Sequence, residues 1–146
     1  MSLVLRPADP RDAPEMARIL WQFQHQHDWM PYLYSLDECL GYCAEMVARG
    51  WCTVAELCGR VGGFLALDGE EVYALYVAAP VQGRGAGRLL IEQAKSERDR
   101  LELRCVEPNT AARNFYRAQG FVEAGPAETT EDNLPGLTYV WPEEAI

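Results

Sequence analysis

A glycine-rich turn between a strand and a helix constrains this chain more than any other feature of its sequence. The segment Gln82-Gly-Arg-Gly-Ala-Gly-Arg88 follows an apolar run at 71–77 and opens an amphipathic stretch from about Gly87 to Arg98. Glycines let the backbone approach a ligand closely, and a helix N-terminus presents unpaired N–H groups to an anion. Arg84 and Arg88 add fixed positive charge. We therefore expect a site for a phosphate-bearing ligand, the alternative being a tight turn that needs glycine for its geometry alone.

Two common nucleotide-binding motifs do not fit this segment. The dinucleotide fingerprint G-x-G-x-x-G fails, because its last position is Arg88 when counted from Gly83 and Leu90 when counted from Gly85. A P-loop needs Gly-Lys-Ser/Thr, and the only lysine of the chain is Lys95, inside the expected helix. The ligand is therefore not expected to be held by either motif.

The hydrophobic pattern predicts one α+β domain over residues 1–146. The first half shows a short strand at 4–6, a helix capped by Asp9 and a second helix with a capping box at Ser35 and Glu38. Three strands that read as a meander follow, at 51–57, 61–67 and 71–77. After the glycine-rich helix come a strand at 101–106, a helix at 111–119, an extended segment from 121 and a last strand at 137–141. Antiparallel strands followed by strand–helix units predict a layered α+β sandwich.

Charge and cysteine content limit the expected partners. The chain has a net charge of −9, so it repels phosphate backbones, and neither nucleic acid nor an anionic membrane is expected as a partner. Its five irregularly spaced cysteines are typical of reduced thiols, and the apolar start at 1–5 is too short for a signal-peptide core. A cytoplasmic location is therefore expected. No metal is expected, because the spacings of Cys39 with Cys43 and of His25 with His27 match no known zinc pattern.

A second segment, residues 109–121, makes the interpretation of the glycine-rich turn more specific. Taken alone it is a short helix with a polar start. Together the two segments resemble the GNAT superfamily of acetyl-CoA-dependent N-acetyltransferases, in a small bacterial form. That family carries Q/R-x-x-G-x-G/A after its fourth strand, matched here at Gln82 to Gly87. Its downstream pattern N-x-x-A-x-x-F-Y-x-x-x-G-F is matched at Asn109, Ala112, Phe115, Tyr116, Gly120 and Phe121.

The resemblance implies a fold and a co-substrate. The expected fold is a three-layer α/β/α sandwich whose mixed, mostly antiparallel sheet carries a bulge in its fourth strand and is splayed between its fourth and fifth strands. The pantetheine arm of acetyl-CoA would pair with the backbone of Leu75, Tyr76 and Val77. Asn109 would hydrogen-bond the same arm. The pyrophosphate would be wrapped by the amides of Gln82, Gly83, Arg84, Gly85, Ala86, Gly87 and Arg88. A homodimer is left open, because members of the family are often dimers.

The resemblance also implies catalytic roles for an amine that attacks the thioester directly. Tyr116 would lie near the sulfur and donate a proton to the departing thiolate, the alternative being a packed core tyrosine. Glu71 is the candidate general base, because alternation along the strand puts it on the face of Tyr73, Leu75 and Val77. Relatives of this subgroup more often carry a glutamate where Tyr73 stands, so a water chain is the alternative base.

The acceptor pocket has no sequence motif. Trp29, Tyr32 and Tyr34, with Tyr73, are candidates for an aromatic wall beside the acceptor, the alternative being a core or dimer contact. Six acidic residues after position 118 could line a mouth for a cationic amine or form a solvated surface. A small amine or a protein amine is therefore expected as the acceptor. Two other classes stay open: a non-catalytic acyl-CoA-binding module, and transfer to oxygen or of a longer acyl group.

Overall fold

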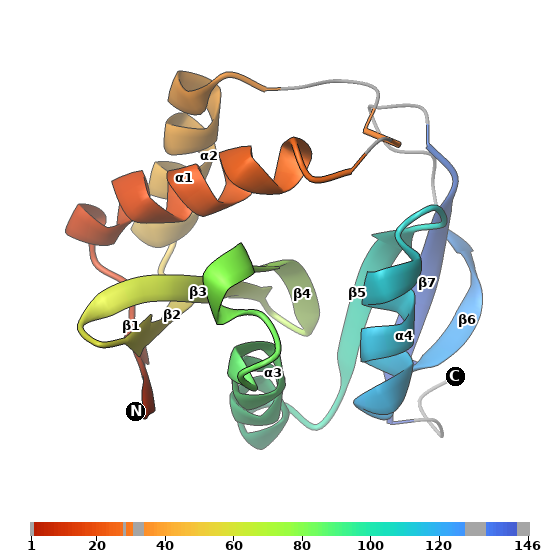
Figure 1. The fold of residues 1–146 in the computed structure, drawn as a ribbon. Helices are drawn as coiled ribbons and strands as arrows, with labels where there is room; N and C mark the ends of the chain where they lie inside the picture. Colours follow the sequence, from red (N-terminus) through yellow and green to blue (C-terminus); the bar gives the residue numbers. More distant parts are fainter. Residues whose placement is uncertain (1, 28, 31–33, 128–133, 143–146) are drawn as a thin grey trace.

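The computed structural model describes residues 2–27, 29–30, 34–127 and 134–142. Within these residues the strands form one seven-stranded sheet in the order β1-β2-β3-β4-β5-β7-β6 (Figure 1). No helix in the described ranges combines the length and apolar character that crossing a bilayer requires. The strands are β1 (Leu3–Pro7), β2 (Cys52–Leu57), β3 (Arg60–Asp68), β4 (Glu71–Val77), β5 (Leu101–Val106), β6 (Val122–Ala127) and β7 (Gly136–Trp141). The α-helices are α1 (Ala13–Gln24), α2 (Leu36–Ala48), α3 (Ala86–Glu97) and α4 (Thr110–Ala118), with short 3₁₀ turns η1 (Pro10–Asp12) and η2 (Ala79–Val81).

Capping residues fix the starts of the first two helical segments. Asp9 accepts a hydrogen bond from the N–H of Arg11 at 2.8 Å, but the turn that it caps is η1, and α1 follows at Ala13. Ser35 Oγ accepts from the N–H of Glu38 at 3.1 Å, and the Glu38 carboxylate accepts from the N–H of Ser35 at 2.9 Å. The capping box predicted for α2 is therefore confirmed.

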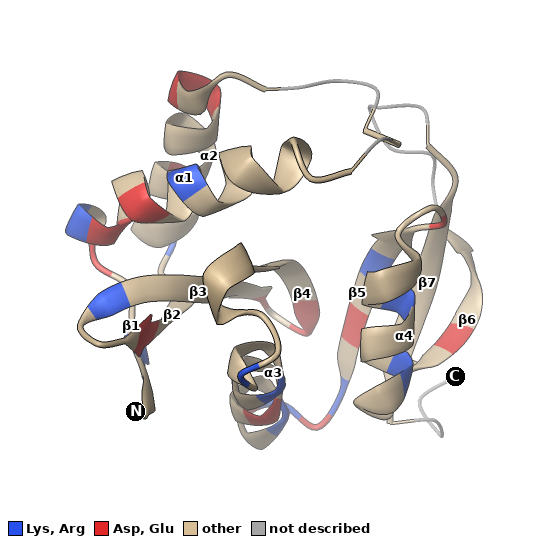
Figure 2. Ribbon diagram, viewed as in Figure 1, with Lys and Arg blue, Asp and Glu red and all other residues tan. Residues whose placement is uncertain are grey.

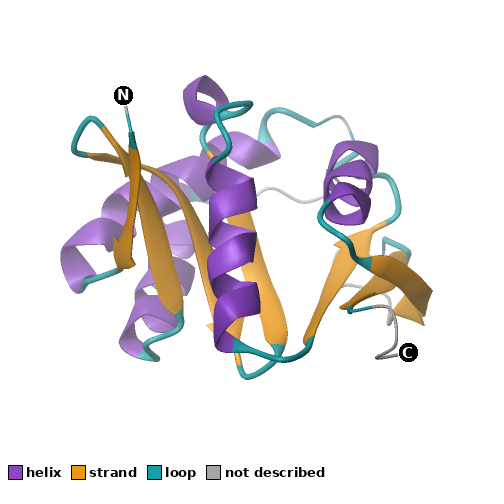
Figure 3. Ribbon diagram, turned by 90° about the horizontal axis from the view of Figure 1, so that it is seen from below, coloured by secondary structure: helices purple, strands orange, loops and turns teal. Residues whose placement is uncertain are grey.

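The sheet is covered on both faces, as the three-layer prediction requires. The helices α1 and α2 lie on one face, and α3 and α4 lie on the other (Figure 3). The core under α1 and α2 buries Met16, Cys39, Cys43, Met46 and Phe64. The core under α3 and α4 buries Leu90, Ile91, Leu101, Leu103 and Tyr139. Two separate apolar cores thus hold the sheet from opposite sides.

The sheet separates between β4 and β5, as predicted. Described neighbours in the sheet order pair antiparallel except β4 and β5, which are parallel and share a single register pair, Glu71 with Glu102. Beside that pair, the N–H of Glu102 donates to the carbonyl of Glu70 at 2.9 Å. Figures 1 and 3 show the two strands diverging from this point. The sheet is therefore joined at one end of β4 and open at the other.

A bulge in β4 overturns one expectation about its faces. Opposite β3, Val72 pairs with Leu67 and Ala74 pairs with Ala66, so Tyr73 is the extra residue of the bulge. Val72, Leu75 and Val77 pack on the α3 side, whereas Ala74 packs on the α1–α2 side. Tyr73 lies on that second side as well, because its ring contacts Tyr42 and Trp51. The prediction that Glu71 shares a face with Leu75 and Val77 is therefore wrong, because the bulge reverses the alternation between them.

A buried carboxylate ties β1 to the turn before α1. Asp12, only 7% exposed, accepts two hydrogen bonds from the guanidinium of Arg6, at 2.7 and 2.9 Å. It also accepts from the N–H of Asp9 at 2.8 Å. The hydrogen bonds from Arg6 hold the pKa of Asp12 below its ordinary value in spite of burial. A carboxyl with a lowered folded-state pKa stabilises the fold above its unfolded pKa and loses that contribution as pH falls.

We predict that Asp12→Asn lowers the free energy of unfolding at pH 7 by about 1–3 kcal/mol, because the charge-assisted pair with Arg6 is lost. The difference from the wild type should shrink below about pH 4, where the unfolded-state carboxyl is protonated. Urea unfolding at pH 7 and at pH 3 measures both values. The exposed Asp68→Asn should change stability by less than about 0.5 kcal/mol at either pH. An equal difference between wild type and Asp12→Asn at the two pH values would contradict the proposed ion pair.

Candidate active site

A cleft of about 650 Å³ opens where β4 and β5 separate. Its walls come from β4, the glycine-rich turn, β5, the start of α4 and the segment after α1. This volume lies in the range of pockets that bind small molecules. The cleft therefore brings together both sequence motifs, although they lie far apart in the chain.

Past Glu71, the β4 wall pairs with no strand of the described residues on its cleft side. The N–H of Ala78 donates to the carbonyl of Gly62 at 2.8 Å, and Tyr76 pairs with Phe64 of β3. Because backbone groups alternate in direction along a strand, those of Leu75 and Val77 point away from β3, toward the cleft. The side-chain amide of Gln82 already donates to the carbonyl of Val77 at 3.0 Å. Of the three residues expected to pair with a ligand, Leu75 and Val77 are thus the two whose backbone groups point toward the cleft.

The glycine-rich turn forms a run of backbone N–H groups before α3. Gly83 and Gly85 have φ values of +82° and +88°, a conformation that favours glycine. The N–H groups of Gln82 and Arg84 donate to the carbonyls of Ala78 and Val81 at 3.1 and 3.2 Å. No backbone acceptor in the described ranges pairs with the remaining N–H groups of the turn and first helical residues, those of Gly83, Gly85, Ala86, Gly87 and Arg88. Of the seven amides expected to wrap a pyrophosphate, five are therefore left without a backbone acceptor in the described residues.

Two of the described residues that line the cleft are basic and none is acidic, although the chain as a whole is acidic. Figure 2 shows basic and acidic positions together on α3 and β5, and basic positions on α4. Arg88 and Arg104 line the cleft, and Arg88 also pairs with Glu92 at 2.9 Å. Arg84 is exposed and lies outside the cleft lining. The local field therefore favours an anion in the cleft.

The two motifs contact each other at the mouth of the cleft. A Cβ on Gly87 would lie 3.1 Å from Cζ of Phe115, so the absence of a side chain lets α4 pack against the start of α3. Asn109 is the N-cap of α4, and its Oδ1 accepts from the N–H of Ala112 at 3.2 Å. Because the cap uses only the oxygen, the Nδ2 group of Asn109 is left to donate to a ligand in the cleft.

Tyr116 lies on the inner side of α4 and lines the cleft. It is 9% exposed, and its ring packs against Phe115, Phe121 and Tyr139. Burial raises the pKa of Tyr116 above its ordinary value, and the nearby Cys105 and Tyr76 add to the increase. The phenol therefore stays protonated at neutral pH, which is the state that a proton donor requires.

Glu71 lies at the closed end of the separation, away from the cleft lining. It pairs in register with Asp68 on β3 and with Glu102 on β5. The cleft is lined by β4 from Val72 onward and does not include Glu71. The role of Glu71 as a general base stays a prediction, and this position does not support it.

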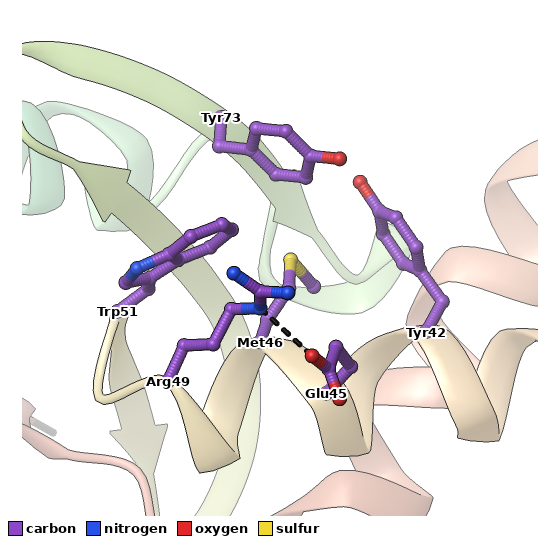
Figure 4. A pocket seen from close by; sticks show the side chains of 6 residues that line it. All are labelled: Tyr42, Glu45, Met46, Arg49, Trp51 and Tyr73. Carbon is purple, nitrogen blue, oxygen red and sulfur yellow. Dashed lines mark hydrogen bonds and ion pairs between the residues drawn. The ribbon is translucent and has the colours of Figure 1, made fainter.

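Tyr73 lines the cleft and also a second, smaller hollow of about 290 Å³ on the α2 side. Figure 4 shows the hydroxyls of Tyr73 and Tyr42 pointing toward each other across this hollow. Its other wall holds Trp51 with the guanidinium of Arg49 5.2 Å from the ring centroid, and Arg49 pairs with Glu45 at 2.8 Å. Tyr73 is thus held among aromatic neighbours at one edge of the cleft.

The other expected acceptor residues separate in the structure. Trp29 lines the cleft, whereas Tyr34 packs against the core under α1 and α2. Tyr32 lies outside the described residues. Of the six acidic residues after position 118, only Glu123 is described, and it pairs with Arg113 and Arg117 at 3.8 and 3.6 Å.

Two residues that were not expected at the site lie at the end of α1 and directly after it. The buried amide of Gln24 donates to the carbonyl of Tyr34 at 3.1 Å and accepts from its N–H at 2.7 Å, which joins the two ends of the loop between α1 and α2. His27, inside that loop, lines the cleft. A buried glutamine at a helix end gives no sequence signal, and the pair His25 and His27 suggested only a metal.

Comparisons with known proteins agree with this architecture. The family model described as "Acetyltransferase (GNAT) domain" matches residues 48–123. A relative from Salmonella typhimurium, named peptidyl-lysine N-acetyltransferase YjaB, is 36% identical over 82 residues, which are 55% of this chain and 57% of that protein. The chain is therefore matched to little more than half the length of this curated relative.

Solved structures resemble the whole fold. Apo-form YjaB from Escherichia coli has a TM-score of 0.82 and 24% identity, over 97% of this chain and 98% of that one. The yncA protein of Salmonella typhimurium, solved with its cofactor acetyl-CoA, has a TM-score of 0.70 and 20% identity, over 96% and 92% of the two chains. With a family model that covers more than half of its residues, this chain belongs to the GNAT acetyltransferase family.

Proposed function

We propose that residues 1–146 act as one acetyltransferase domain that transfers the acetyl group of acetyl-CoA to a primary amine. The observation that carries this proposal is the unpaired β4 edge, which meets a run of free N–H groups at the start of α3. An extended pantetheine arm can add to such an edge as an extra strand, and a pyrophosphate suits the N-terminus of a helix. The yncA protein, a neighbour with the same fold, was solved with acetyl-CoA.

The residues of the cleft would bind the donor, stabilise the charge that develops during the reaction and donate a proton to the leaving group. The amine forms a bond to the thioester carbonyl carbon, and the carbon–sulfur bond breaks. The N–H of Val77, which points toward the cleft, would stabilise the negative charge that develops on the carbonyl oxygen, a contribution of about 3 kcal/mol by analogy with other such donors. The protonated phenol of Tyr116 would donate to the departing thiolate. Asn109 and Gly83–Arg88 would hold the donor in place.

The proposed acceptor is the amine of a lysine side chain in a peptide or protein. The relative YjaB is named a peptidyl-lysine N-acetyltransferase. A chain with a net charge of −9 attracts a basic partner, which agrees with a lysine-bearing acceptor.

All five cysteines lie in the described part of the chain and form no disulfide, which supports the expected cytoplasmic location.

Replacing Tyr116 tests the chemistry. Tyr116→Phe keeps the packed ring and removes the hydroxyl, so we expect kcat to fall by about 10²-fold with little change in the KM for acetyl-CoA. The release of free thiol from acetyl-CoA with a lysine peptide measures the rate. Tyr139→Phe is the matched control, because Tyr139 is a fully buried tyrosine outside the cleft whose hydroxyl contacts Arg113 and Glu123. Full activity of Tyr116→Phe would remove its role as the proton donor.

Replacing Gly85 tests the binding of the donor. Alanine at φ +88° is strained by about 1–2 kcal/mol, and relief of that strain would move the free N–H groups of the turn. Gly69, in the turn between β3 and β4, has φ +61° and open space around it, so Gly69→Ala is a control with similar strain outside the cleft. We expect both variants to lose similar stability, and only Gly85→Ala to lose about tenfold or more in affinity for acetyl-CoA by calorimetry. Equal affinities for the two variants would contradict the anion site.

A further inference from the structure

One step of the proposed reaction still lacks a residue. A lysine amine has an ordinary pKa of about 10, so at neutral pH it arrives as an ammonium group with no free lone pair. Something in the cleft must accept a proton before the nitrogen can attack. The described residues that line the cleft include no aspartate or glutamate, and Glu71 lies outside it.

The other titratable groups of the cleft are poor proton acceptors. Apart from one imidazole, the titratable or charged side chains among its described lining residues are Tyr73, Tyr76, Arg88, Arg104, Cys105 and Tyr116. Phenols and guanidinium groups are ordinarily protonated at neutral pH. Burial raises the pKa of Cys105 to about 11. The remaining group is the imidazole of His27, and histidine is the side chain that most often serves as a general base.

The contacts of His27 place its ring on the α1 side of the cleft. The ring centroid lies 4.5 Å from that of Phe23 and 5.0 Å from that of Trp29. Phe23 in turn lies 5.0 Å from Tyr76 of β4, between the loop and the strand. Figure 1 shows the chain after α1 running toward the half of the sheet that contains β5 and β7. The imidazole is therefore held by aromatic rings on the α1 side, whereas Tyr116 comes from α4.

We propose that His27 accepts the proton of the acceptor ammonium, an inference that rests on the proposed function. The nitrogen gives one proton to the imidazole, which passes it to solvent, and the freed lone pair forms the nitrogen–carbon bond. When the carbon–sulfur bond breaks, Tyr116 protonates the sulfur and is reprotonated by the second proton that leaves the nitrogen. The aromatic rings of Phe23 and Trp29 beside the imidazole also favour a cationic acceptor before it loses its proton. The two proton-transfer groups thus come from different walls of the cleft.

An acceptor whose nitrogen already carries a free lone pair at neutral pH separates this role from a structural one. A lysine peptide and its aminooxy analogue have nearly the same shape, but the aminooxy nitrogen is unprotonated at neutral pH. We expect His27→Gln and His27→Asn to lower kcat/KM for the lysine peptide by about 10²-fold at pH 7 and to leave the aminooxy peptide unaffected. His25→Gln is the matched control, because His25 is exposed, its ring centroid lies 4.5 Å from that of Trp21, and it does not line the cleft. Thermal unfolding confirms that each variant is folded.

Every outcome of the activity measurements on the two peptides either supports or overturns the proposal. A loss restricted to the lysine peptide supports proton transfer to His27. Equal losses on both peptides would show that His27 only positions the acceptor, and full activity on both would show that it has no role, so either result overturns the proposal. Binding of acetyl-CoA without transfer by the wild-type protein would instead contradict the proposed function, and this inference with it.

Discussion

The single point at which β4 joins β5 is the constraint on which the site depends. The hydrogen bond from the N–H of Glu102 to the carbonyl of Glu70 closes one end, and from there the strands separate because each is held by a different set of neighbours. Backbone groups left unpaired inside a fold cost free energy unless water or a ligand satisfies them. The separation that weakens the sheet therefore creates the edge to which an extended ligand can add.

The two sequence motifs are in contact with each other at Gly87 and Phe115. Gly87 belongs to α3, which packs beside β4, whereas Phe115 belongs to α4, which follows β5. A side chain at position 87 would meet the Phe115 ring, so the glycine has a packing role besides its role near an anion. This contact joins the two halves of the molecule on the side where the sheet no longer does.

Local sequence patterns predicted many of the helices, strands and turns. The features that depend on contacts between distant parts of the chain could not be predicted from these patterns. The cap at Ser35, the strand at 101–106 and the glycine-rich turn all follow from neighbours in sequence, and the structure shows them in place. The bulge at Tyr73 depends on how β4 fits β3, so simple alternation misplaced Glu71. Gln24 bonds Tyr34, ten residues further along the chain, and His27 lines a cleft whose other walls come from β4, β5 and α4. No periodicity of the chain encodes these contacts.

Hydrogen exchange of backbone amides, with and without acetyl-CoA, tests most directly whether the open edge of β4 binds the donor. Saturating acetyl-CoA should slow exchange at Leu75 and Val77 and at the free N–H groups from Gly83 to Arg88. Exchange at Gly69, in the turn at the far end of β4, should stay the same. Unchanged exchange along β4 and the glycine-rich turn, at a concentration that saturates binding, would contradict the assignment of this edge as the binding site.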